Sequence, residues 1–216
     1  IGGIVNAASH RPAPDNYVSP GSIISIYGIG LANETREARR DDMVNGRLPE
    51  NLGGASVWFG SVKAPLFYVS PLQITAQAPV ELGFGDWVVK VQVNSLESAE
   101  TVVVRKYSPG LFATMRHADG ALVSRELAAR PGQWVLVYGT GFGSTHPYLP
   151  SGVLAPLQPT WWFELGPPAA RIGDIPLARE DIYYWGLAPG FAGLYQFNLR
   201  IPASAPAGDL EVQVQD

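Results

Sequence analysis

Short apolar runs bounded by turn residues recur along this chain. One of them, IISIY at residues 23–27, follows Pro20-Gly21 and precedes a Gly-x-Gly at residues 28–30. A Pro-Gly turn, five β-forming residues and a second sharp bend predict a buried β-strand. The run QITAQ at residues 73–77 alternates apolar and polar residues instead, as a strand with one solvated face does. No segment shows a convincing helical period, so the pattern predicts an all-β fold.

One sequence motif, which we call the repeated phrase, occurs twice in the chain. RPGQWVLVYGTGFG at residues 130–143 repeats SPGSIISIYGIGLA at residues 19–32 without a gap, at an offset of 111 residues. QFNLRIP at residues 196–202 repeats QITAQAP at residues 73–79, now at an offset of 123 residues. The second copy has therefore gained residues, and the Pro-rich segment near 144–168 is the expected place.

A repeat of about 100 residues built from short strands is typical of a β-sandwich of immunoglobulin-like size. We therefore expect two tandem immunoglobulin-like β-sandwich domains, residues 1–107 and 108–216. The Ser-Pro-Gly joint at 108–110 is short, which predicts a fixed angle between them. Residues 33–43 lack an apolar stripe, and we expect an exposed loop with about one helical turn and Asn33 as its N-cap.

Composition narrows the function classes. The net charge is −4, and the basic cluster Arg36, Arg39 and Arg40 is neutralised by neighbouring acids, so we expect neither nucleic acid nor membrane insertion. The chain has no cysteine, which excludes disulfides and thiolate metal sites. It begins at Ile1 and not at Met, so we expect either a removed leader or a piece of a larger protein.

The sequence offers little catalytic chemistry. The three histidines, His10, His117 and His146, lack a metal-binding spacing, and we expect no metal and no cofactor. No Gly-x-Ser-x-Gly elbow is present, and no helical pattern follows either Gly-x-Gly to bind a phosphate. We therefore expect a protein that is not an enzyme.

Several segments together carry a family resemblance. These are IVNAAS (4–9), LGGASVWFG (52–60), APLFYVSPLQITAQAP (64–79), SPGLF (108–112), GLAPGFAGLYQFNLRIP (186–202) and the repeated phrase. In this order they resemble an uncharacterised C-terminal domain family of secreted proteins of Acidobacteria such as Solibacter. More loosely, the chain is similar to the IPT/TIG class of immunoglobulin-like domains. The resemblance implies a secreted or cell-surface module, and it provides no catalytic residues to carry over.

The second copy is one predicted strand short. In the first copy the strands at 87–93 and 101–106 follow residue 79, whereas in the second copy only residues 210–215 follow residue 202. An incomplete sheet leaves unpaired backbone groups that a strand from another chain can fill. We expect an acceptor edge at Leu210, Val212 and Val214, and a donor strand from the next copy at Ile1, Ile4, Val5 and Ala7. Such a contact generates a filament; the alternative is that a shorter sheet suffices.

Aromatic residues are dense in the second copy. The cluster comprises Trp161, Trp162, Tyr183, Tyr184 and Trp185. Exposed, these rings would bind polysaccharide or anchor a subunit contact; the alternative is that they fill the core or the domain interface. The leading hypothesis is thus a non-enzymatic extracellular structural module that self-associates, and the alternative is a cell-surface adhesion or carbohydrate-binding module.

Overall fold

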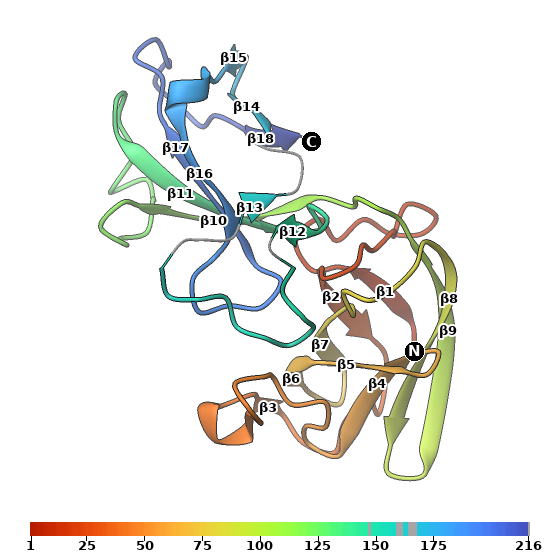
Figure 1. Ribbon diagram of the computed structural model, residues 1–216. Helices are drawn as coiled ribbons and strands as arrows, with labels where there is room; N and C mark the ends of the chain where they lie inside the picture. Colours follow the sequence, from red (N-terminus) through yellow and green to blue (C-terminus); the bar gives the residue numbers. More distant parts are fainter. Residues whose placement is uncertain (147, 159–161, 164–167, 216) are drawn as a thin grey trace.

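The computed structural model describes residues 1–146, 148–158, 162–163 and 168–215, and its regular structure is almost entirely antiparallel β-strand (Figure 1). The first half of the chain forms two sheets, sheet 1a with the strand order β1-β2-β7-β6-β3 and sheet 1b with the order β5-β4-β8-β9. Their strands are β1 (Gly3–Asn6), β2 (Ile23–Tyr27), β3 (Arg36–Glu37), β4 (Ala55–Phe59), β5 (Val62–Ala64), β6 (Leu66–Val69), β7 (Gln73–Gln77), β8 (Gly85–Val93) and β9 (Leu96–Val104).

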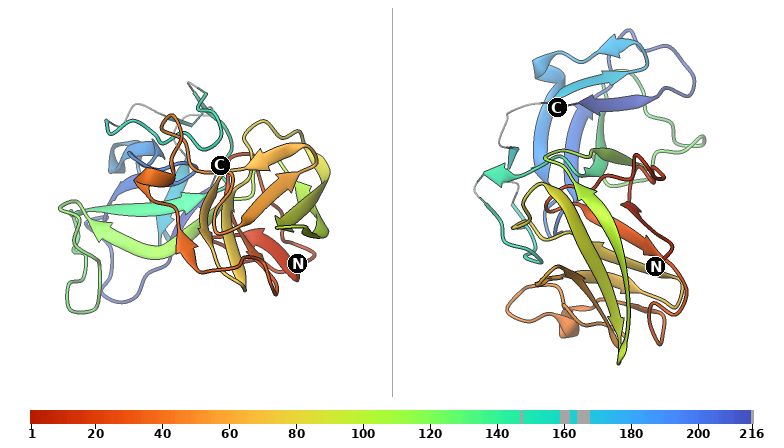
Figure 2. Two further views of the ribbon diagram at one scale, coloured as in Figure 1. Left: turned by 90° about the horizontal axis from the view of Figure 1, so that it is seen from below. Right: turned by 90° about the vertical axis from the view of Figure 1, so that its right-hand side faces the viewer.

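The second half again forms two sheets. Sheet 2a has the order β10-β11-β17-β16-β13-β12, and sheet 2b has the order β15-β14-β18. Their strands are β10 (Gly110–His117), β11 (Trp134–Thr140), β12 (Thr145–His146), β13 (Trp162–Phe163), β14 (Ala169–Ile172), β15 (Ile175–Pro176), β16 (Ile182–Leu187), β17 (Tyr195–Arg200) and β18 (Val212–Gln215). The two halves are visible as two lobes, and the long β8–β9 hairpin points away from the second one (Figure 2).

Each half has its own apolar core. The first core includes Ile24, Phe59 and Val89 and contains no buried residue beyond Val104. The second includes Val137, Phe197 and Val214. Each of these cores draws side chains from both sheets of its own half, so the prediction of an all-β fold is confirmed. The expected domain boundary at 107/108 falls between the cores, whereas the immunoglobulin-like identity stays a prediction.

Strand pairing shows that the two halves are copies of one unit. Ile23 lies opposite Gln77 between β2 and β7, and Trp134 lies opposite Arg200 between β11 and β17. The offsets of 111 and 123 residues found in the sequence carry the first pair onto the second. The two repeated segments therefore form two adjacent strands in each half, β2 and β7 in the first and β11 and β17 in the second, with the same register.

A third part of the repeat escaped the sequence comparison. The β4–β5 hairpin turns at Gly60 and the β14–β15 hairpin at Gly173, both with φ 58°. The Gly60 amide donates to the Val88 carbonyl at 3.0 Å, and the Gly173 amide donates to the Glu211 carbonyl at 2.8 Å. Sheets 1b and 2b are thus equivalent, with β8 corresponding to β18.

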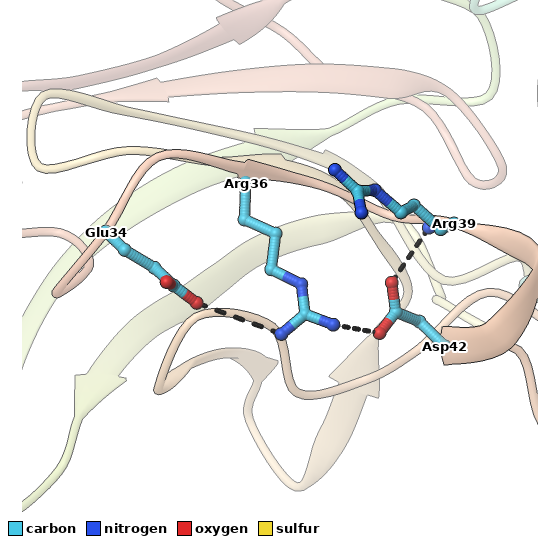
Figure 3. A network of polar contacts seen from close by, with 4 residues as sticks. All are labelled: Glu34, Arg36, Arg39 and Asp42. Carbon is cyan, nitrogen blue, oxygen red and sulfur yellow. Dashed lines mark hydrogen bonds and ion pairs between the residues drawn. The ribbon is translucent and has the colours of Figure 1, made fainter.

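The loop at residues 33–43 forms one 3₁₀ turn, η1 (Arg40–Asp42), and the short strand β3. Its N-cap is Arg39, so the prediction of Asn33 is wrong. The expected charge neutralisation is present: the Arg36 guanidinium lies between the carboxylates of Glu34 and Asp42, and the Arg39 amide donates to Asp42 Oδ2 at 2.8 Å (Figure 3). A second 3₁₀ turn, η2 (Arg179–Asp181), precedes β16.

Buried tyrosines should make the second half sensitive to alkali. Burial raises the pKa of Tyr184 to about 12 and also raises the pKa of Tyr195. The unfolded chain therefore loses these protons from about pH 10 upward while the folded chain keeps them, and stability falls as the pH rises from 10 towards 12.

We expect Tyr184→Phe to remove about 2 kcal/mol of this loss, measured by urea denaturation at pH 8 and pH 11.5. Tyr183→Phe is the matched control, because its side chain is exposed. An equal pH dependence in the wild type and in Tyr184→Phe would contradict the assignment.

Candidate functional site

Three features of the described residues bear on function: the joint between the halves, the outer edge of β18, and the exposed aromatic residues of the second half. The joint is centred on Thr140, the last residue of β11. The Ile23 amide donates to Thr140 Oγ1 at 2.8 Å, and Thr140 Oγ1 donates to the Gly193 carbonyl at 2.8 Å. The side chain is fully buried, so this one hydroxyl satisfies two backbone groups at the joint, one from each half.

Contacts on either side of Thr140 broaden the joint. On one side, Asn6 Nδ2 donates to the Ser108 carbonyl at 2.7 Å, and Ser108 Oγ donates to the Tyr17 carbonyl at 2.6 Å. On the other side, the Gly152 amide donates to Gln77 Oε1 at 2.7 Å. Gly152 belongs to the Pro-rich segment that the second copy gained, and this insertion therefore helps to fasten the two halves together.

The two halves approach each other closely at the joint. A small cavity of about 30 Å³ lies there between Pro20, Gln77 and Tyr195. A Cβ added at Gly141 would lie 2.0 Å from the Ser108 carbonyl oxygen, and one at Gly193 would lie 2.4 Å from the Gly21 carbonyl oxygen. Backbone thus meets backbone here, which supports the expected fixed angle between the halves.

The outer edge of β18 is the second feature. β18 pairs with β14 on one side, and no other strand of the described residues pairs with it. Its counterpart β8 lies between β4 and β9, with Val89 opposite Glu100 and Val91 opposite Ser98. The strand of sheet 1b that has no equivalent among the described residues of the second half is therefore β9.

Backbone direction identifies the unpaired groups. The Gly173 amide bonds the Glu211 carbonyl, so Glu211, Gln213 and Gln215 direct their backbone groups towards β14. The N–H and C=O groups of Val212 and Val214 consequently face the open side. Their side chains face the core, but Val212 is only partly buried whereas its counterpart Val89 is fully buried.

This edge lacks the devices that usually prevent strand pairing. Val212–Gln215 reads VQVQ, with no charge and no proline. By contrast, the outer strand β9 of sheet 1b contains Glu97 and Glu100, and the other edge of sheet 2b is the two-residue strand β15, which ends in Pro176. Of the predicted acceptor residues, Val212 and Val214 lie in β18, whereas Leu210 precedes the strand and packs against the core.

The predicted donor strand is already in use. Residues 3–6 form β1, in which Ile4 pairs with Ile26 and Val5 with Ser25. Ile4 and Ala7 are buried in the first half, and the Ile1 ammonium donates to Ser98 Oγ at 2.8 Å. The interpretation of this segment as a free donor is therefore corrected: the open position beside β2 takes it up within its own half.

The predicted aromatic surface is also corrected in part. Tyr184 and Trp185 are buried on opposite faces of β16, because both faces of the strand are covered there, and the Tyr184 hydroxyl donates to the Leu187 carbonyl at 2.6 Å. Tyr183 is 72% exposed. Trp161 lies outside the described residues, and of Trp162 the structure describes the backbone, which pairs in β13 with Gly186 of β16.

The partner of Tyr183 could not be predicted from the sequence. Its ring meets the ring of Trp134 edge-on, with 6.0 Å between the centroids. The Arg200 guanidinium lies 5.6 Å from the centroid of Trp134 and pairs with Asp181 at 2.6 Å. Trp134 and Arg200 lie at the positions that correspond to Ile23 and Gln77 of the first half. The pairing of β17 with β11 on one side and with β16 on the other brings them close to Tyr183.

Other kinds of site find little support among the described residues. They contain no group of three or more His, Asp or Glu that could hold a metal ion. None of the helical segments in this part of the chain has the length and apolarity needed to cross a membrane. No protein-family model, curated protein or solved structure matches the chain. The structure thus defines an all-β protein with a rigid joint and an open sheet edge.

Glycines at equivalent positions test the joint. Gly141 (φ 86°) and Gly30 (φ 70°) are counterparts, but a Cβ at Gly30 would meet nothing within 4 Å. We expect Gly30→Ala to cost about 1–2 kcal/mol from backbone strain. Gly141→Ala should cost a further 1–3 kcal/mol, roughly, because it overpacks the joint. Urea denaturation measures both losses, and equal losses would contradict a close joint.

Adjacent prolines test the direction of the backbone groups in β18. Gln213→Pro removes an N–H that faces β14, and Val212→Pro removes one that faces the open side. We expect Gln213→Pro to destabilise the second half by at least about 2 kcal/mol more than Val212→Pro. Thermal unfolding of the two variants measures the difference. Equal destabilisation would show that a partner strand already covers the edge.

Proposed function

We propose that this chain is a non-enzymatic extracellular structural module that associates with a second copy of itself by pairing β18 with β18. The observation that carries the proposal is the open side of β18, with the outward backbone groups of Val212 and Val214. A second strand that pairs with such an edge satisfies its outward N–H and C=O groups and covers its partly exposed apolar side chains.

A second copy fits this edge because the strand is complementary to itself. In an antiparallel pair centred on Gln213, the outward groups of Val212 face those of Val214 in the partner. Both valine side chains then stay on the core side and Gln213 on the solvent side. The strand carries no charge, so it brings no like charges together. The resulting contact is the same on both copies and closes as a dimer.

The rigid joint supports a structural role. Thr140, Asn6 and Gln77 fasten the halves through buried or partly buried hydrogen bonds. A module with a fixed angle between its two halves holds the partners bound at its ends and edges at a constant distance and orientation. The extracellular location rests on the resemblance described in the sequence analysis.

Disulfide trapping tests the β18 contact directly, because the chain has no native cysteine. In the proposed pair the two Gln213 residues lie opposite each other with Cβ atoms about 4.5–5.5 Å apart. We expect Gln213→Cys to yield a covalent dimer under mild oxidation, seen by non-reducing electrophoresis. Glu97→Cys, on the outer strand of sheet 1b, is the matched control and should remain monomeric.

Proline variants supply the equilibrium test by sedimentation velocity. Val212→Pro should be monomeric at concentrations where the wild type is dimeric. Ala99→Pro is the control, because Ala99 also directs its N–H to an open edge, that of β9, opposite Lys90. A wild-type chain that stays monomeric, or a Val212→Pro variant that dimerises normally, would overturn the proposal.

A further inference from the structure

The joint within one chain shows which surfaces of the repeat fit together. The first half contributes the start of β2 and the end of β7, through Ile23 and Gln77. The second half contributes the end of β11 and the turn before β17, through Thr140 and Gly193. Because the halves are copies of one unit, each surface has a counterpart on the other half, and the described residues of a single chain leave both counterparts exposed.

The free counterpart of the Thr140 surface is an apolar tip on the first half. Ile29 occupies the position of Thr140, between Gly28 and Gly30, the counterparts of Gly139 and Gly141. Ile29 is 90% exposed, and Leu72 beside it is 63% exposed. The Gly28 amide donates to the Leu72 carbonyl at 3.1 Å, which holds the two apolar side chains in one place. We call Tyr27, Ile29 and Leu72 the tip.

The free counterpart of the Ile23–Gln77 surface is an aromatic end on the second half. Trp134 corresponds to Ile23 and Arg200 to Gln77. Tyr183 stands against Trp134, and the charge of Arg200 is neutralised by Asp181. Beside Trp134 lies an open depression of about 580 Å³ whose lining is largely polar and includes Asp119, Arg125 and Glu126. The aromatic part of this surface is the ring pair of Trp134 and Tyr183. We call this ring pair the far end, which lies about 20 Å along β11 from Thr140.

We propose that the tip of one copy docks on the far end of a second copy, in the way that the second half docks on the first within one chain. An exposed apolar tip and the aromatic ring pair of Trp134 and Tyr183 gain by covering each other. The exposed side chains at both surfaces differ from the hydrogen-bonding Thr140 and Gln77 of the internal joint. The contact between copies is therefore apolar, where the internal contact is polar.

This contact has a different symmetry from the β18 pair. The tip and the far end are different surfaces, so the contact is heterologous and each added copy offers a new free surface. The product is an open filament in which half-repeats follow one another in a single row. The proposal does not depend on the β18 edge, and the two can fail separately.

The test uses charged substitutions in the full chain, in the Val212→Pro background that removes the β18 contact. Ile29→Asp alters the tip and Tyr183→Asp alters the far end; both side chains are exposed, so the fold is unaffected. Leu96→Asp is the matched control, since Leu96 is 76% exposed on the β8–β9 hairpin. At concentrations above those of the sedimentation test, where Val212→Pro is still monomeric, we expect fibres in negative stain for the parent and for Leu96→Asp. Each of the other variants should weaken association by about 30-fold or more.

Mixing the two charged variants tests the pairing of the surfaces. Ile29→Asp keeps an intact far end and Tyr183→Asp keeps an intact tip, so an equimolar mixture should form a heterodimer that cannot grow, seen by sedimentation velocity. A parent that forms no fibres, single variants that polymerise normally, or a mixture that stays monomeric would overturn the proposal. If the monomer binds soluble polysaccharide and this binding is lost only in Tyr183→Asp, the far end is instead a glycan-binding site.

Discussion

Every strand inside a sheet needs hydrogen-bonding partners on both of its sides, and the two halves of this chain meet that requirement differently. In sheet 1b, β8 has β4 on one side and β9 on the other. In sheet 2b, β18 has β14 alone among the described residues. The same backbone groups that bond β9 in the first half therefore face outward in the second, and the proposed association follows from that difference.

The joint gives this edge a fixed place in the molecule. Thr140 is bonded to both halves, and the glycines around it bring backbone against backbone, so the lobes cannot rotate without breaking buried hydrogen bonds. The joint shows which two surfaces of the repeated unit fit together within one chain. The tip and the far end are the counterparts of these two surfaces, and the described residues leave them exposed. The two proposed contacts lie on different parts of the surface, an edge and two ends.

The strands whose positions depend on the local pattern of residues could be predicted from the sequence. The repeated phrase located β2 and β11, and its offsets agree with the register of the strands that pair with them. The equivalence of the hairpins at Gly60 and Gly173 was missed, because the glycine is almost their only shared residue. Strand alternation did not predict that Tyr184 and Trp185 are both buried, since that depends on what covers each face of β16.

The candidate site was predicted less well than the fold. The open edge at Val212 and Val214 follows from counting strands, which requires no tertiary information. The use of Ile4 within its own sheet depends on a free place beside β2. The contact of Trp134 with Tyr183 depends on β11 and β16, which are distant in sequence and lie on either side of β17. Neither has a signal in the local pattern of residues.

Hydrogen exchange at individual backbone amides tests the central claim, that none of the described strands covers the outer side of β18. In dilute, monomeric protein we predict fast exchange at Val212 and Val214 and slow exchange at their counterparts Val89 and Val91. The two valines of β18 should become protected as the concentration rises and the edges pair. Slow exchange at Val212 and Val214 in the monomer would contradict the account, because it would show that the edge is already closed.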